Sequence, residues 1–376
     1  MLTILFTLTA AIQLLFWGSC FRTAYRERWR TPPVVATHPA SVIVCFRNEV
    51  DNLAACVRGI LAQEYPPGFE LILVDDNSTD GSTELARTLE RGDDRVRVLY
   101  PGRTRPGKKD ALAYGIAQAK HERLVLTDAD CIPASRWWLW GIAGRLYGKT
   151  ELLLGVSPYR AEIGAGLLAR WQQFESVYVS LKYLSFSHRG LPYMGVGRNL
   201  AYTKSFFNRA EGFAGHTDLA SGDDDLLVSS AATVVGTAVV VEPETWTYSA
   251  PQPNWEKYFL QRARHQSTGG RYPLEVSVLL TVLAASHGFF YVLGALMLWY
   301  GEVQLVAYCY CIRLLAITYA CAPAYYPEAL LGEDVDAGLG WKIWGKLLAN
   351  VAFFDVWVGP MYLYLAVVGL VGKKSW

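Results

Sequence analysis

The stretch RLVLTDADCIP, residues 123–133, decides the fold, because it joins the pattern of a buried strand to a pair of charged residues. An apolar run at 124–126 leads directly to Asp128 and Asp130, which are separated by a single alanine. Burying two carboxylates at the end of a strand costs free energy unless a cation lies beside them. The stretch therefore predicts a strand that ends at a cation-binding site.

Strands and helices alternate through the residues before this stretch. Apolar and β-branched runs predict strands at 41–46, 70–75, 95–99 and 123–127, with helices between them at 49–63, 82–91 and 109–120. Such alternation predicts an α/β fold, with a parallel sheet covered by helices on both faces. In sheets of this kind ligands bind at the carboxyl ends of the strands.

Polar side chains follow the strand ends, where a ligand site would need them. Asn48 and Glu49 follow the first predicted strand, and Asp75 and Asp76 follow the second. A solvated turn is the alternative for the DDNSTDGS segment at 75–82, since Asp, Asn and Ser favour turns. Acidic residues after three strands would nevertheless repel one another at one edge of the sheet unless a cation or ligand lay between them.

Uncharged segments indicate a membrane protein. Residues 1–21 carry no charge and are long enough to cross a bilayer. Basic residues follow this run instead of preceding it, which favours an uncleaved anchor over a signal peptide and a cytoplasmic location for the domain that follows. Three more apolar runs lie at 275–300, 303–322 and 349–371, and the mixed segment 327–348 is consistent with an interfacial helix.

These segments predict a multi-pass protein of the inner or plasma membrane. The expected parts are an anchor at 1–21, a basic linker at 22–39, a cytoplasmic domain at 40–272 and membrane or interfacial helices at 273–376. Arg313 lies inside an apolar run and is expected to face other helices. Three spans after the domain would place Lys373 and Lys374 on the opposite side, in conflict with the charge rule unless one run is interfacial or re-entrant. The net charge of +1 gives no argument for nucleic acid binding, and we expect none.

Three further motifs carry charged groups. Lys108 opens a helix after a Gly- and Pro-rich loop, where an anion is favoured, although a solvated basic loop explains it as well. SGDDDLL at 221–227 predicts a turn into a packed helix that presents a carboxylate to a cleft, with surface charge as the alternative. In QRARH the residues Gln261, Arg264 and His265 share one helix face, and Arg264 could hold a diphosphate unless the helix faces lipid headgroups.

Six motifs occur in one order over residues 40–270: SVIVCFRNE, LILVDDNSTDGS, GKKDALAYG, LTDAD, SGDDDLL and QRARH. In these motifs the chain resembles the family 2 inverting glycosyltransferases of the GT-A fold, a Rossmann-like fold that binds nucleotide-diphospho-sugars. The resemblance implies a membrane-bound enzyme that moves a sugar from a donor, UDP-sugar by family habit, to a lipid or lipid-linked hydroxyl. A processive synthase of the same family, acting on a growing glycan, is the alternative. A membrane scaffold that has lost catalysis is the alternative outside the enzyme class. His265 replaces a tryptophan of the family motif, which leaves the class of acceptor open.

The resemblance also implies roles for individual residues. Asp224 matches the general base, with Asp223 and Asp225 left as alternatives one position away. Asp130 matches the ligand of Mg²⁺ or Mn²⁺, ions that prefer oxygen donors. Arg264 would stabilise the departing diphosphate. The remaining implied donor-binding residues are Asn48, Glu49, Asp75, Asp76, Lys108, Asp128 and Gln261.

Overall fold

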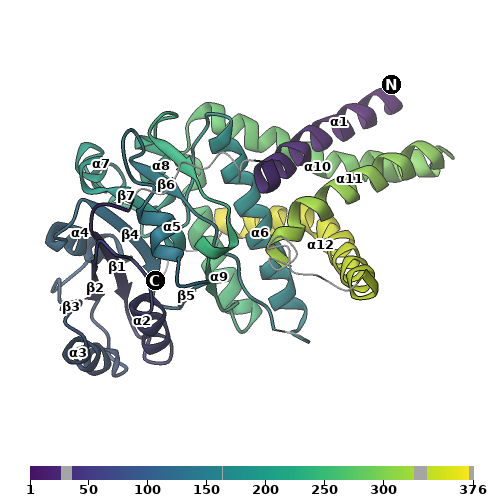
Figure 1. The fold of residues 1–376 in the computed structure, drawn as a ribbon. Helices are drawn as coiled ribbons and strands as arrows, with labels where there is room; N and C mark the ends of the chain where they lie inside the picture. The colour runs from purple at the N-terminus through teal and green to yellow at the C-terminus, as the bar shows by residue number, and fades with distance from the viewer. Residues whose placement is uncertain (27–35, 163, 326–336, 372–376) are drawn as a thin grey trace.

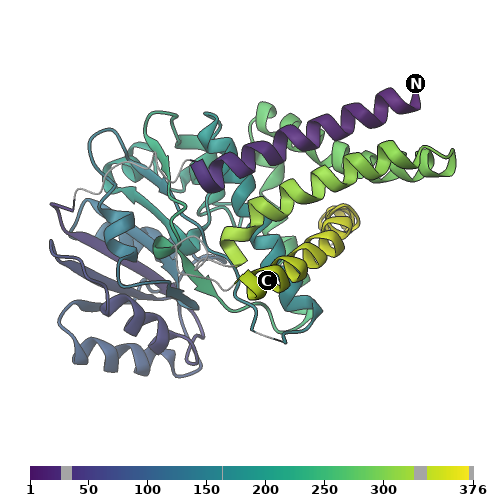
Figure 2. The ribbon, with the colours of Figure 1, turned by 45° about the vertical axis from the view of Figure 1, so that its right-hand side comes forward.

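The computed structural model describes residues 1–26, 36–162, 164–325 and 337–371. A sheet with packed helices forms one end of the molecule, and long helices project from it in one direction (Figure 1). The two ribbon views agree on this arrangement, since the helices nearest the N-terminus and around residues 303–325 extend away from the sheet in both (Figure 2).

The first half of the sheet is parallel and contains all four predicted strands. Its strands are β1 (Ala40–Phe46), β2 (Phe69–Asp75), β3 (Val96–Leu99) and β4 (Arg123–Asp128), in the order β3-β2-β1-β4. The connecting helices are α2 (Leu53–Leu61), α3 (Ser82–Gly92) and α4 (Lys109–Gln118). Phe46 pairs with Asp75, and Cys45 pairs with Asp128. This register brings two of the predicted acidic positions to either side of the end of β1.

The rest of the sheet is short-stranded and mixed, which the sequence pattern did not predict. It consists of β7 (Leu200–Thr203), antiparallel to β4 and to β6 (Leu152–Leu154), with β8 (Thr237–Val239) parallel to β6 at the edge. A second sheet pairs β5 (Cys131–Pro133) with β9 (Thr247–Ser249). The remaining helices of this part are α5 (Trp138–Ala143), α6 (Leu167–His188), α7 (Lys204–Arg209), α8 (Asp225–Ala231) and α9 (Trp255–Gln266), together with short turns such as η3 (Gly197–Asn199).

Apolar clusters cover both faces of the sheet. Ile43 and Leu124 belong to one buried cluster with residues of α4 and α6, whereas Val42 and Val125 belong to the other with residues of α2 and α5. Alternate residues of neighbouring strands therefore point into opposite layers, as expected for a parallel sheet between helices. This packing fixes the carboxyl ends of β1, β2 and β4 relative to one another.

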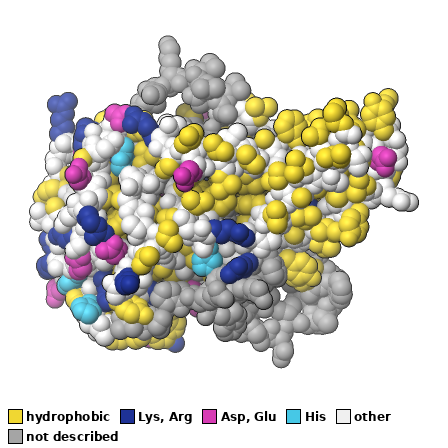
Figure 3. All heavy atoms as spheres, turned by 90° about the horizontal axis from the view of Figure 1, so that it is seen from above, with side chains coloured by type: hydrophobic (Ala, Val, Ile, Leu, Met, Phe, Trp, Pro, Cys, Tyr) yellow, Lys and Arg dark blue, Asp and Glu magenta, His cyan; other side chains and the backbone are white. Residues whose placement is uncertain are grey.

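Four helices are long and apolar enough to cross a membrane. They are α1 (Leu2–Phe21), α10 (Leu274–Trp299), α11 (Val303–Tyr325) and α12 (Ala337–Val371), called here the helix bundle, and the apolar part of α12 is Trp344–Leu365. Hydrophobic side chains cover the projecting part of the molecule on the face seen in Figure 3, whereas charged side chains gather over the sheet. The prediction of four apolar helices is confirmed.

The predicted interfacial helix at 327–348 is not a separate element. Residues 337–348 continue without a break into α12, and residues 327–336 lie outside the described residues. Lys342 and Lys346 lower the hydropathy of this segment, but lysine is a good helix former and does not interrupt a helix. The change of polarity within α12 was therefore interpreted from the sequence as a boundary between two helices.

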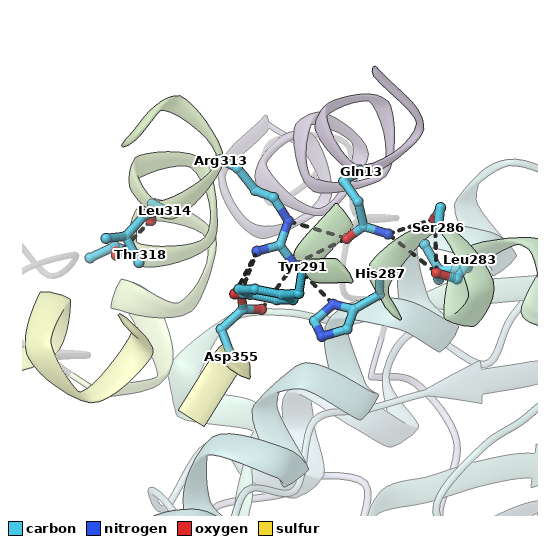
Figure 4. A network of polar contacts seen from close by, with 9 residues as sticks. All are labelled: Gln13, Leu283, Ser286, His287, Tyr291, Arg313, Leu314, Thr318 and Asp355. Atoms are coloured by element: carbon cyan, nitrogen blue, oxygen red, sulfur yellow. Dashed lines mark hydrogen bonds and ion pairs between the residues drawn. The ribbon is translucent and has the colours of Figure 1, made fainter. Parts of the chain in front are cut away.

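A charged network lies inside the helix bundle (Figure 4). Arg313 of α11 pairs with Asp355 of α12, with 3.0 Å between Arg313 Nη2 and Asp355 Oδ1, and both side chains are buried. The same Nη2 donates to Gln13 Oε1 of α1 at 3.1 Å and lies 3.0 Å from His287 Nδ1 of α10. Gln13 in turn donates to Ser286 at 2.8 Å. Arg313 thus faces the other helices, as predicted, and contacts all three.

Candidate active site

Acidic side chains from distant parts of the chain converge on Lys108, which precedes α4. Lys108 Nζ donates to Asp128 Oδ1 at 2.8 Å, at the end of β4. It also lies 3.0 Å from Asp223 Oδ2, just before α8. Cys45, in β1, interacts electrostatically with Lys108, Asp223, Asp128 and Asp76. The structure therefore gathers residues of four predicted motifs around the end of β1.

The charges of this cluster alter the pKa values of its members. Burial disfavours the ionised form of Asp128, but the charge of Lys108 and its hydrogen bond outweigh burial and hold the pKa of Asp128 below its usual range. Burial likewise disfavours the charged form of Lys108, yet Asp128 and Asp223 raise its pKa well above the ordinary value. Asp128 and Lys108 are therefore both charged near neutral pH.

Asp130 has different partners from Asp128. Residues 129 and 130 form a turn after β4, so Asp128 and Asp130 do not lie on one extended segment. Asp130 Oδ2 accepts a hydrogen bond from Ser249 Oγ of β9 at 2.9 Å. Burial, and then the charge of Asp128, raise the pKa of Asp130. The two carboxylates are thus close enough to repel each other although they point to different neighbours.

This part of the cluster suits a divalent cation. Glu49 is also close enough to interact with Asp130 and Asp128. Burial and the charges of these two carboxylates raise the pKa of Glu49, whereas a hydrogen bond from Asn52 lowers it. A cation at this point would relieve the repulsion that raises the pKa of Asp130. In the described parts of the chain no three His, Cys, Asp or Glu side chains could hold a metal ion by themselves. A site with only the carboxylates of Asp128 and Asp130 as ligands fits an ion like Mg²⁺. This ion binds one or two carboxylates and takes its other ligands from water and phosphate.

The three acidic residues before and in α8 differ in their contacts. Asp223 pairs with Lys108. Asp225 Oδ2 accepts from Thr268 Oγ1 at 2.5 Å and from Tyr272 OH at 2.8 Å, which ties α8 to the segment after α9. Asp224 accepts backbone N–H groups of Gly197 and Asp225, at 2.7 and 2.8 Å. Burial, then Asp223 and Asp225, raise the pKa of Asp224 to about 7.

Gly197 allows this close approach. A Cβ atom at Gly197 would lie 2.9 Å from Lys108 Nζ and 3.4 Å from Asp224 Oδ2. Contacts under 3.0 Å do not occur for real Cβ atoms, so any larger residue would displace the lysine. The segment around Gly197 is therefore part of the wall of the candidate site.

Two residues predicted to bind the donor, Asp75 and Asn48, form hydrogen bonds within the loops. Both carboxylate oxygens of Asp75 accept hydrogen bonds within the loop that follows β2, from Ser78 N at 2.9 Å and from Thr83 Oγ1 at 2.5 Å. Asn48 adopts a positive φ of 58° and accepts from Thr79 N at 2.8 Å. These hydrogen bonds are the ones expected if the segment 75–82 forms a turn. Asp76 is buried nearer the cluster.

Helix α9 lies against the site and against the helix bundle. Its Arg262 pairs with buried Glu175 of α6 at 2.7 Å, and Gln261 Oε1 accepts from Tyr159 OH at 3.2 Å. His265 lies within electrostatic range of Asp128, and the side chains of both His265 and Arg264 are exposed. Arg262 and Gln261 thus have different partners, a glutamate of α6 and a tyrosine.

Arg198 is a residue of the site that was not predicted from the sequence. It follows Gly197 in η3, and its charge acts on both Asp128 and Asp130. The arginine lies between a glycine and an apolar strand, which is a weak signal, because its neighbours at the site come from other segments of the chain.

Comparison with known proteins identifies this part of the chain. Residues 41–179 match the family model Glycosyl transferase family 2. They form a glycosyl transferase family 2 domain. This family 2 domain is 32% identical over 138 residues to glycosyltransferase AglE of Haloferax volcanii, covering 36% of this chain and 45% of AglE. It is 28% identical over 151 residues to a beta-monoglucosyldiacylglycerol synthase of Nostoc sp., covering 36% of this chain and 32% of that protein. The matches thus span less than half the length of these relatives.

A solved structure resembles nearly the whole chain. The mannosyltransferase PcManGT of Pyrobaculum calidifontis, in complex with GDP-Man and Mn²⁺, superposes with a TM-score of 0.57 and 19% identity, covering 97% of this chain and 100% of its own. At this identity the likeness establishes the fold alone. The predicted GT-A fold beside membrane-length helices is therefore confirmed.

Proposed function

We propose that the protein transfers a hexose from a nucleotide-diphospho-sugar to a hydroxyl group of a membrane lipid or lipid-linked acceptor. The convergence of Asp128, Asp223 and Asp224 around Lys108 carries this proposal, because it puts acidic groups of separate motifs in one place. The four helices of membrane length support an acceptor in the bilayer. A diacylglycerol-modifying relative and a fold neighbour with GDP-Man bound are consistent with both substrates.

The acidic triplet supplies the general base. Asp224 removes the proton from the acceptor hydroxyl, whose oxygen attacks the anomeric carbon from the side opposite the diphosphate. The bond to the acceptor oxygen forms as the bond to the diphosphate oxygen breaks, and the diphosphate leaves with the electron pair, so configuration inverts. Asp224 is favoured over its neighbours because Asp223 is paired with Lys108 and the carboxylate of Asp225 is tied to the side chains of Thr268 and Tyr272. The side-chain oxygens of Asp224 accept hydrogen bonds from backbone N–H groups.

The remaining residues bind the donor and its leaving group. Asp130 and Asp128 would hold Mg²⁺ or Mn²⁺, which supplies positive charge to the departing diphosphate when it is bound. Glu49, Asp76 and Lys108 line the donor site, while Asn48 and Asp75 hold its loops in place. Arg264 approaches the diphosphate from α9, and Gln261 positions Tyr159 at the same site.

One experiment tests the function directly. The full chain, purified in detergent, is incubated with UDP- and GDP-sugars, Mn²⁺ and a lipid extract, and the products are identified by mass spectrometry. We expect a lipid that has gained one hexose. A polymer would identify a processive synthase instead, and the absence of both transfer and donor hydrolysis would refute enzymatic activity.

Removal of the metal ligand should weaken donor binding. Asp130→Ala is expected to lower the Mn²⁺-dependent affinity for the nucleoside diphosphate at least about tenfold, equivalent to about 1.4 kcal/mol. Titration calorimetry with UDP and GDP, in Mn²⁺ and in chelator, measures this loss. Asp93→Ala removes a surface carboxylate paired with Arg95 and serves as the control. Equal affinity of wild type and variant in both buffers would contradict the metal assignment.

The raised pKa of Asp224 predicts a pH dependence. A base must be ionised to accept a proton, and burial beside Asp223 and Asp225 keeps Asp224 protonated up to about pH 7. The kcat/KM for the acceptor should therefore rise with pH through about 7 and level off above it. A pH series with saturating donor measures this profile. An inflection near about 4, where an ordinary carboxyl group titrates, would place the base in a different environment.

A further inference from the structure

The backbone of Arg198 is fixed directly beside the carboxylate pair. Its carbonyl oxygen accepts from Thr127 Oγ1 at 2.9 Å, in the strand that ends at Asp128. It also accepts from Thr247 Oγ1 at 2.9 Å, in β9. The position of Arg198 is therefore set by the same two strands that position Asp128 and the partner of Asp130.

Its side chain is held by an aromatic ring. The guanidinium lies over the ring of Tyr159, 4.3 Å from its centroid. Tyr159 is buried and fixed at both ends, because its N–H donates to Ser176 Oγ at 3.0 Å and its hydroxyl donates to Gln261. A stacked, planar guanidinium loses little conformational freedom when it binds a ligand.

The hydrogen-bonding capacity of this guanidinium is incompletely used. Arg198 Nη1 is buried and has no hydrogen-bond partner among the residues that the structure describes. Its charge acts on Asp128 and Asp130, but neither carboxylate forms an ion pair with it in the described chain. A buried N–H group without an acceptor costs free energy. An anionic oxygen placed between the guanidinium and the carboxylate pair would remove that cost.

We propose that Arg198 binds a phosphate oxygen of the donor diphosphate, on the side of the site formed by Asp128 and Asp130. This inference rests on the proposed function. Lys108 already has two carboxylate partners, so Arg198 is the better placed cation for an incoming anion. Its fork of N–H groups matches phosphate oxygens, and these bonds strengthen as negative charge builds on the departing diphosphate. Arg198 therefore contributes to donor affinity and to turnover.

Binding by the full chain in detergent tests the proposal. Arg198→Gln is expected to weaken the affinity for UDP or GDP in Mn²⁺ at least about tenfold. The affinity for the parent nucleoside, measured by displacement of a labelled nucleotide, should change less than about threefold, because the nucleoside has no diphosphate. Arg198→Lys keeps the charge without the planar fork and should recover part of the loss. Arg160→Gln is the matched control, because Arg160 also stacks on a tyrosine, Tyr248, but is exposed. It should bind like the wild type.

Each outcome separates this inference from the proposed function. If wild-type protein binds neither nucleoside diphosphate, the proposed function fails. If wild type binds and Arg198→Gln binds within about twofold of it, only the role of Arg198 is refuted. An equal loss of nucleoside affinity, or a lower unfolding temperature, would show a structural role. Unchanged donor affinity with a raised KM for the acceptor would assign the arginine to an acceptor phosphate instead. Arg198→Lys decides the question if the glutamine variant does not fold.

Discussion

Asp224→Asn is expected to reduce the turnover number of sugar transfer by about 10²- to 10⁴-fold, the usual contribution of a general base. The amide has the same size as the carboxylate but cannot take a proton from the acceptor. Affinity for the donor should change little, since Asp224 contacts Gly197 and Asp225 and not the Asp128–Asp130 pair. Steady-state kinetics with a lipid acceptor and calorimetric binding of UDP or GDP measure the two quantities separately.

The neighbouring aspartates provide matched comparisons for this variant. Asp225→Asn disturbs hydrogen bonds to Thr268 and Tyr272, so it should lower the unfolding temperature more than it lowers turnover of the folded fraction. Asp223→Asn removes one of the two partners of Lys108 and should change donor affinity. If Asp223→Asn abolished turnover at unchanged donor affinity while Asp224→Asn stayed active, the base would be Asp223.

Asp355→Ala is expected to cost the helix bundle about 3–5 kcal/mol, the usual effect of breaking a buried ion pair. The substitution leaves the charge of Arg313 buried between helices, where the uncharged groups of Gln13 and Tyr291 and the ring of His287 lie beside it (Figure 4). An uncompensated charge at such a place is costly in a membrane protein. A lower midpoint of thermal unfolding in detergent, and loss of monodisperse protein, would show the effect.

A double substitution distinguishes the lost pair from lost packing. Arg313→Leu combined with Asp355→Leu removes both charges and should restore much of the stability, because a buried ion pair is often no better than well-packed apolar residues. Leu315→Ala, on the exposed side of the same helix, is the control and should change the midpoint little. If Asp355→Ala behaved like Leu315→Ala, the network would not hold the bundle together.

The parallel half of the fold was predictable because its strands are long. β1, β2 and β4 each contain an apolar run that a short window detects, and the helices between them carry their own periodicity. β6 and β8 contain three residues each and become strands only by pairing with neighbours distant in sequence. The continuity of α12 was not predicted because the polarity of the sequence changes within this one helix, and the change was interpreted as a boundary.

The sequence predicted which residues belong to the candidate site better than it predicted their contacts. Motif order pointed to Asp128 and the triplet at Asp224, and the structure brings them together at Lys108. Asp75 was assigned to the donor, yet its bonds are those of a turn, which the same residues favour when no ligand is considered. Arg198 could not be found from local pattern, because its significance depends on Tyr159, which comes from another segment.

The charge balance around Lys108 has a consequence for the order in which ligands arrive. Four carboxyl groups, those of Asp128, Asp130, Asp223 and Glu49, lie around Lys108 and Arg198. A bare nucleotide with its own negative charges is repelled by such carboxyl groups, whereas the same nucleotide complexed with a dication is nearly neutral and meets no comparable barrier. On the proposed function, we therefore expect the donor to bind as its complex with a dication and not as the bare nucleotide.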